Sequence, residues 1–234
     1  MDFLVEGLRR ALTLLAGADP DVVDIATLSL RVALVSTLLA CGVGVPAGFL
    51  LGTTRFWGRR AVLTVLNTML AFPTVVIGLL VWGLLARQGP LGGLGLLYTW
   101  WAIVVAEVVL AVPIAAALTA AAVQGVDPRV RRTALTLGAG PWRAHWTVAR
   151  EVRYALLAAV IVAFGRVLAE VGAAMMVGGN IRHHTRTLTT AVTLATSQGD
   201  FGLAVALGLV LVALALTVNV LLHLLQGRGD AGGS

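Results

Sequence analysis

Residues 97–123 of this chain read LYTWWAIVVAEVVLAVPIAAALTAAAV, with Glu107 as the single charged side chain. A helix needs about 20 predominantly apolar residues to cross the roughly 30 Å of hydrocarbon in a bilayer. The segment therefore predicts a transmembrane helix.

Four further windows have the same character, and they cover residues 25–51, 61–86, 154–177 and 201–225. Over 234 residues, 59% are hydrophobic and 12% are charged, whereas about a quarter of a soluble domain is charged. This composition excludes a cytosolic enzyme, a disordered tail and a secreted disulfide scaffold. We expect an all-α protein, a polytopic membrane helix bundle of about five transmembrane helices forming one domain over residues 1–234.

The arginines predict the orientation of the bundle. Three lie between the first two spans, six lie between the third and fourth, and one follows the last span, against six on the other side. The positive-inside rule therefore places the N-terminus outside and the C-terminus in the cytoplasm. Topology accounts for the net charge of +6, so we expect no nucleic-acid partner. Residues 3–15 suit either an interfacial helix or the start of the first span.

The chain contains no lysine, since all its basic residues are arginine. A Walker A loop needs a lysine on the nucleotide phosphates, so any ATP that drives this protein must bind to another chain. His183 and His184 are adjacent and point to different helical faces, which disfavours a metal site. No Ser/His/Asp set stands out, and we therefore expect neither an enzyme nor a bound cofactor.

The loop 124–153 is predicted to fold as a helix-turn-helix on the cytoplasmic side. An Asp-Pro pair at 127–128 is typical of a helix start, and Gly-Ala-Gly-Pro at 138–141 ends that helix and begins another. The second helix carries Trp142 and Trp146. Exposed aromatic and basic residues of this kind suit docking to a partner protein, or an amphipathic loop lying on lipid headgroups.

Arg166 and Glu170 lie four positions apart in the fourth span. A charge at the bilayer centre costs at least about 2.5 kcal/mol, so we expect the two side chains to form an ion pair. In one interpretation Arg166 faces an anion path, and in the other the pair fixes helix packing. Glu107 is a third buried charge without an assigned partner.

The external segment 178–200 is a candidate for substrate handling. Gly178 and Gly179 permit positive φ and expose N–H groups that can form an anion-binding nest. Hydroxyls and guanidinium groups follow, which suit a tetrahedral dianion; the alternative is a helix cap before an amphipathic outer helix. The candidate residues for the substrate path or gate are Arg166, Glu170, Gly178, Gly179, Asn180, Arg182, Thr185, Arg186 and Thr187.

The loop 124–153 resembles the cytoplasmic E-A-A-x3-G-x9-I-x-L-P loop of permease subunits of type I ABC importers. The similarity rests on Arg132-Thr133-Ala134 followed by Gly138, and Arg132 stands where the family has its first glutamate. The run 164–181, FGRVLAEVGAAMMVGGNI, is similar to the tungstate importer permeases. Molybdate and sulfate permeases share a looser version and are the alternatives.

This resemblance implies a membrane-spanning permease that moves an oxyanion by alternating access. The implied partners are a second copy of the chain, ABC ATPase subunits that bind ATP and Mg, an extracytoplasmic oxyanion-binding protein, and membrane lipid. The residues implied to dock the ATPase are Arg132, Thr133, Ala134, Gly138, Gly140 and Trp142. A carrier driven by an ion gradient is the alternative from another class, and it would show internal repeats and no docking loop.

Overall fold

The computed structural model describes residues 5, 8–9, 11–13, 16–17 and 19–227, and this part of the chain is built from helices without a strand. The prediction of an all-α protein is confirmed. The predicted helix at residues 3–15 lies largely outside the described residues. The elements are α2 (Pro20–Thr53), α3 (Arg59–Leu70), α4 (Thr74–Leu85), the 3-10 turn η1 (Gly92–Leu94), α5 (Trp100–Gln124), α6 (Pro128–Thr136), α7 (Pro141–Glu151), α8 (Arg153–Leu168), α9 (Gly172–Gly178), α10 (Leu188–Ser197) and α11 (Phe201–Gly227).

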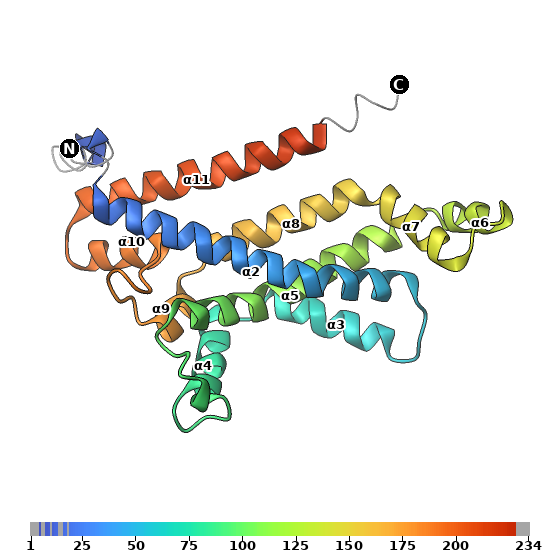
Figure 1. Ribbon diagram of the computed structural model, residues 1–234, viewed down its shortest axis with the longest axis horizontal. Coiled ribbons are helices and arrows are strands. Elements are labelled where there is room, and N and C mark those ends of the chain that lie inside the picture. The colour runs from blue at the N-terminus through green and yellow to red at the C-terminus, as the bar shows by residue number, and fades with distance from the viewer. Residues whose placement is uncertain (1–4, 6–7, 10, 14–15, 18, 228–234) are drawn as a thin grey trace.

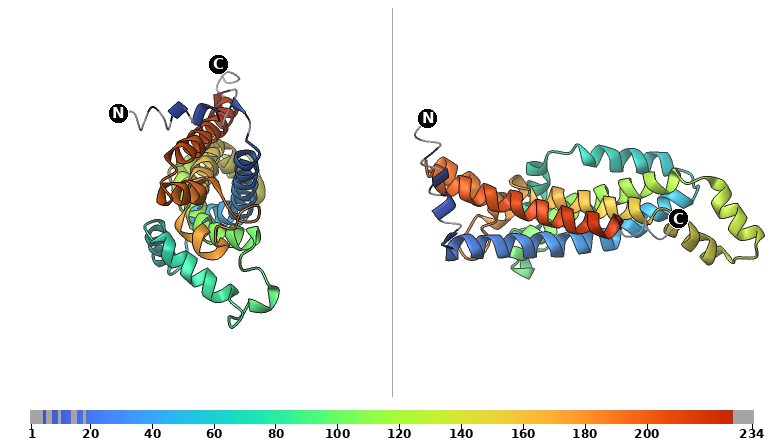
Figure 2. Two further views of the ribbon diagram at one scale, coloured as in Figure 1. Left: turned by 90° about the vertical axis from the view of Figure 1, so that its left-hand side faces the viewer. Right: turned by 90° about the horizontal axis from the view of Figure 1, so that it is seen from above.

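Helix α5 forms the centre of the bundle, and α2, α3, α4, α8 and α9 pack around it (Figures 1 and 2). Within its most apolar window 72% of the residues are buried, compared with 28% for α2 and 22% for α11. Most of the buried residues of α5 are alanine or valine. Small side chains let neighbouring backbones approach closely, which is how helices associate in a membrane.

Three helices, α2, α5 and α11, are long and apolar enough to cross a membrane in the described part of the chain. Two further crossings result if each bent helix pair counts as one span: α3 with α4, bent by 102°, and α8 with α9, bent by 57°. The five windows predicted from the sequence coincide with these three helices and two pairs.

Proline accounts for one of the two breaks. Pro73 stands before Thr74 at the start of α4, and a proline disfavours the helical conformation of the residue before it. Pro46 and Pro113 lie inside the continuous helices α2 and α5. Of these three prolines, Pro73 alone coincides with a break in a helix.

The two broken spans meet each other at their breaks. A Cβ built on Gly172, the first residue of α9, would lie 2.8 Å from Cγ2 of Val75 in α4. A Cβ on Gly78 would lie 2.8 Å from Cα of Ala173. Both distances are shorter than real Cβ contacts, so α4 and α9 cross at a separation that only small residues permit (Figure 1).

A glycine series on α2 sets the contact with α5. A Cβ on Gly44, Gly48 or Gly52 would lie 2.8, 2.3 or 2.6 Å from an atom of α5. At Gly48 the nearest atom is the backbone oxygen of Ala116, which cannot move aside without shifting the helix. The series at 44, 48 and 52 is thus a helix-packing seam of the small-xxx-small kind.

Gly48→Ala is expected to destabilise the protein by about 1–3 kcal/mol, the usual cost of overpacking a close contact. Gly42→Ala is the matched control on the same helix, because a Cβ there meets nothing within 4 Å. Alanine is the better helix former, so the control should be neutral or slightly stabilising. Thermal unfolding of the detergent-purified protein measures both effects. Equal unfolding midpoints for the two variants would contradict the close packing of α2 on α5 at Gly48.

Candidate functional site

Helices α6 and α7 form a hairpin at one end of the molecule, beyond the ends of the long helices (Figures 1 and 2). Oδ1 of Asp127 accepts the N–H of Arg129 at 2.8 Å and caps α6, with Pro128 as the first helical residue. At the other end the N–H of Ala139 donates to the oxygen of Ala134 at 3.0 Å around Gly138, which has φ +83°. This is a Schellman cap, which requires the left-handed conformation that glycine adopts most easily. The structure thus has the predicted helix-turn-helix.

A groove of about 570 Å³ lies between α6 and α7. Leu137 at its edge is 82% exposed and adds a large apolar side chain to this surface. A Cβ on Gly138 or Gly140 would meet nothing within 4 Å, so the surface at the turn is open. The groove is lined by Arg129, Val130, Thr133, Ala134, Leu137, Ala139 and Thr147.

The predicted docking residues divide between different surfaces of the hairpin. Thr133 and Ala134 line the groove, whereas Trp142, 81% exposed, lines a separate hollow of about 410 Å³ against the 45–50 stretch of α2. Trp142 therefore lies beside α2, one of the helices long and apolar enough to cross a membrane. Arg132 faces a third cavity. The sequence interpretation missed Leu137, whose exposure depends on the turn that follows it.

The charged pair lies at the break in the fourth span. Nη1 of Arg166 donates to Oε2 of Glu170 at 3.0 Å, which is the predicted i,i+4 ion pair. Oε1 of Glu170 accepts the N–H of Ala173 at 3.0 Å. The backbone oxygen of Glu170 accepts the hydroxyl of Thr189 at 2.7 Å. The Glu170 side chain is 2% exposed and that of Arg166 is 38% exposed. Glu170 therefore joins α8, α9 and α10, while the Arg166 side chain is partly exposed.

Glu107 does not join this pair through any hydrogen bond in the described residues. It is buried, and its Oε2 atom has no hydrogen-bond partner in that part of the chain. Ser36 and Thr37 of α2 and Thr119 of α5 carry buried hydroxyls in the same condition. These unpartnered polar groups all belong to α2 and α5, two helices that pack against each other at the centre of the bundle.

Several backbone and hydroxyl groups of the external segment are already hydrogen-bonded to other protein groups. The N–H of Gly179 donates to the oxygen of Met175, and the N–H of Ile181 donates to Oγ1 of Thr185. Thr187 caps α10 through a capping box with Thr190. The anion nest predicted from the glycines would need these N–H groups free, and in this conformation they are bonded. The geometry matches the alternative interpretation, a cap before an outer helix.

Acidic residues at the start of α2 face the external arginines. Arg182 pairs with Asp21, and Nδ1 of His183 lies 3.0 Å from Oδ2 of Asp24. Arg186 bonds the side-chain oxygen of Asn180 at 3.3 Å. Arg186 also lines a cavity of about 210 Å³ that Asp19, Asp21 and Asp200 share. Carboxylates around Arg182 and Arg186 weaken the interpretation of either residue as an open anion site.

Of the candidate path residues, Arg166 and Glu170 are thus brought together at the break, Gly178 ends α9, and the rest follow α9. Gly178 is buried, and a Cβ there would lie 2.8 Å from Cδ1 of Ile103, so this glycine serves packing. Asp200 caps the last helix by accepting the N–H of Leu203 at 3.1 Å. Among the described residues no three His, Cys, Asp or Glu side chains are grouped to hold a metal ion.

Residues 44–231 match the family model of the binding-protein-dependent transport system inner membrane component. The chain belongs to this family. It is a multi-pass inner-membrane permease of an ABC transporter, a transport subunit and not an enzyme. A permease of an ABC uptake system works with an ATPase and a substrate-binding protein, so the alternative of a self-sufficient carrier is excluded.

Curated relatives extend over nearly the whole permease. It is 38% identical to the tungstate uptake system permease protein TupB of Peptoclostridium acidaminophilum, over 97% of this chain and 99% of that one. The protein of the same name from Campylobacter jejuni is also 38% identical, over 97% and 95%. The molybdenum transport system permease protein ModB of Escherichia coli K12 is 31% identical, over 81% and 86%. The resemblance to oxyanion permeases is confirmed.

A solved structure agrees with the fold. The crystal structure of an amino acid ABC transporter with histidines matches with a TM-score of 0.68 at 18% identity, covering 92% of this chain and 96% of that one. At this identity the likeness concerns the fold alone. The permease therefore has the type I ABC importer architecture that the sequence predicted.

Proposed function

We propose that this permease carries tungstate into the cell, as the membrane subunit of an ATP-driven importer. The observation that supports this most is the 38% identity over 97% of the chain to two tungstate uptake permeases. Identity to the molybdenum permease is lower, at 31% over 81% of the chain. Molybdate and sulfate are therefore the alternative substrates.

In the proposed orientation the end bearing the α6–α7 hairpin lies in the cytoplasm, with the N-terminus outside. The support is the arginine distribution, because Arg55, Arg59, Arg131, Arg132 and Arg143 all belong to the loops and helices at that end. At the opposite end, at the start of α2, Arg182 and Arg186 lie beside Asp19, Asp21 and Asp24. The partner ATPase, which holds ATP and Mg, would then bind the hairpin groove.

The proposed path follows the broken helices. Discontinuous helices near the middle of a membrane commonly surround substrate sites in transporters, because their freed backbone groups line a cavity. Here the breaks at Pro73 and Glu170 adjoin, and Arg166 at the second break is partly open. Arg166 can offer N–H donors to a passing oxyanion while Glu170 weakens its hold, which favours release.

A second copy of the chain would complete the path. Exposed apolar residues of α4, such as Val75, Leu79 and Leu80, and of α11, such as Leu216 and Val220, leave two helices with large uncovered faces. Either lipid or a second protein chain could cover such apolar faces, so the faces alone do not indicate a dimer. The support for a homodimer comes from the family resemblance. ATP closure of two ATPase subunits on the two hairpins would then rock the helices between inward-open and outward-open states.

The substrate class is tested with the permease reconstituted in vesicles together with its ATPase and its binding protein. We expect tungstate to stimulate ATP hydrolysis at lower concentrations than molybdate, and sulfate to have the smallest effect. Preferential stimulation by molybdate or sulfate would move the assignment to that anion. Equal stimulation by all three would contradict tungstate specificity and leave the importer function intact.

A further inference from the structure

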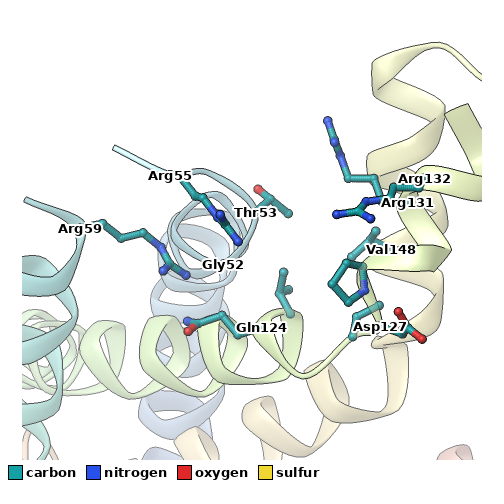
Figure 3. A pocket seen from close by; sticks show the side chains of 12 residues that line it. Gly52, Thr53, Arg55, Arg59, Gln124, Asp127, Arg131, Arg132 and Val148 are labelled. Atoms are coloured by element: carbon teal, nitrogen blue, oxygen red, sulfur yellow. The ribbon is translucent and has the colours of Figure 1, made fainter. Parts of the chain in front are cut away.

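Four arginines from two separate parts of the chain surround one cavity at the hairpin end of the bundle. The cavity has a volume of about 430 Å³, which lies within the range of small-ligand pockets. In Figure 3 Arg55 and Arg59 enter from one side and Arg131 and Arg132 from the other. The polar side chains that line it include Arg55, Arg59, Arg131, Arg132, Gln124 and Asp127.

The guanidinium groups have no carboxylate partner in the described residues. None of the four belongs to an ion pair found in that part of the structure. Among the described residues of the lining, Asp127 is the only acidic one, and its Oδ1 atom accepts the N–H of Arg129. Four positive charges against one negative charge leave an excess that an anion would balance.

Two contacts hold the cavity in shape. Nε of Arg59 donates to the backbone oxygen of Leu51 at 2.7 Å, so this guanidinium is fixed at the end of α2 with its terminal nitrogens still available. Gly52 lies so close to α5 that a Cβ there would be 2.6 Å from Cβ of Val123. The crossing of α2 and α5 thereby fixes the floor of the cavity. A site with a fixed donor and a fixed floor is preorganised for its ligand.

We propose that this cavity binds a phosphate-like oxyanion group. Arginine suits such a ligand, because its planar fork donates two parallel N–H bonds to the oxygens of a tetrahedral anion. Two sources share this chemistry: the headgroup of an anionic phospholipid, and a free oxyanion in the solution at this end of the protein. If the proposed orientation is right, that solution is the cytoplasm, and the transported anion itself reaches the site after release.

The test compares the wild type with Arg55→Gln/Arg131→Gln, two arginines that make no hydrogen bond found in the described residues. Arg60→Gln/Arg143→Gln is the matched control, since it removes the same charge from the same end of the protein outside the cavity lining. In the first arm, the full-length chain in neutral phosphatidylcholine nanodiscs is titrated with tungstate by calorimetry at fixed ionic strength. In the second arm, nanodiscs also contain phosphatidylglycerol, and native mass spectrometry measures the anionic lipid that the chain retains.

We expect the cavity variant to bind about tenfold more weakly than the wild type and the control in one of the two arms. Loss in the first arm identifies a free oxyanion, and loss in the second identifies a lipid headgroup. Arg55→Lys/Arg131→Lys should keep part of the affinity, because it restores the charge without the planar fork.

Equal binding by the cavity variant and the control in both arms would overturn the proposal. The proposal would also be overturned if the cavity variant lost its association with the ATPase but bound tungstate and anionic lipid like the wild type. Neither arm measures uptake, and tungstate bound in the transport path is common to all variants. Failure of this site is thus distinguishable from failure of the proposed transport function.

Discussion

Leu137→Asp is expected to weaken binding of the ATPase by about 30-fold or more while the permease remains folded. Leu137 is 82% exposed beside the α6–α7 groove, so its removal uncovers no core, and the aspartate places a charge where an apolar contact is needed. Truncating a central interface residue typically costs about 2 kcal/mol or more, which is a loss of about 30-fold in affinity. Co-purification and ATPase titration on reconstituted permease measure this loss.

Two further variants sharpen the test of the docking groove. Ala134→Trp fills the groove without adding charge and should weaken ATPase association as well. Thr136→Asp adds the same charge on α6 outside the groove lining and should leave the affinity within about twofold. If Leu137→Asp and Thr136→Asp have the same affinity for the ATPase, the groove is not the ATPase site. The exposed tryptophans of α7 then become the next candidates.

Glu170→Ala is expected to have the largest effect on folding. The substitution removes the ion pair with Arg166 and the hydrogen bond from the N–H of Ala173. These two interactions stabilise the break between α8 and α9. Breaking a buried ion pair costs about 3–5 kcal/mol, and the partial exposure of Arg166 places this case at the lower end. We expect a much lower yield of folded protein, measured by size-exclusion chromatography in detergent.

The neutral pair Arg166→Gln/Glu170→Gln separates the two roles considered for these residues. It removes both charges, and the amide oxygen of the glutamine that replaces Glu170 can still accept the N–H of Ala173, so the protein should fold. If Arg166 serves the anion path, tungstate uptake falls at least about tenfold in this folded variant. Uptake at the wild-type rate would show that the pair only fixes the helix packing.

The transmembrane helices and the hairpin were predictable because local residues determine them. Continuous apolar windows mark α2, α5 and α11, and Asp127 with Pro128 marks the start of α6. The glycines at 44, 48 and 52 share one helical face, and a spacing of four residues brings Arg166 to Glu170. Each of these features depends on neighbours within one helix.

The break at Glu170 was not predictable in this way. No proline lies near it, and the bend depends on contacts from distant segments: Thr189 donates to the backbone oxygen of Glu170, and Gly172 packs on Val75. Likewise the partners Arg182 and Asp21 are 161 residues apart in the chain. A single sequence gives no local pattern for pairs of this kind, which is why Arg182 looked like a free anion-binding residue.

We expect this chain to pass tungstate across a membrane only when a separate ATPase drives the transport. The most direct measurement is accumulation of tungstate in vesicles that contain the permease and its ATPase, with the binding protein on the side of the external segment and ATP on the side of the hairpin. We expect accumulation against a gradient that requires ATP and that falls strongly with Leu137→Asp. Accumulation without the ATPase, or driven by an imposed ion gradient in the absence of ATP, would contradict it.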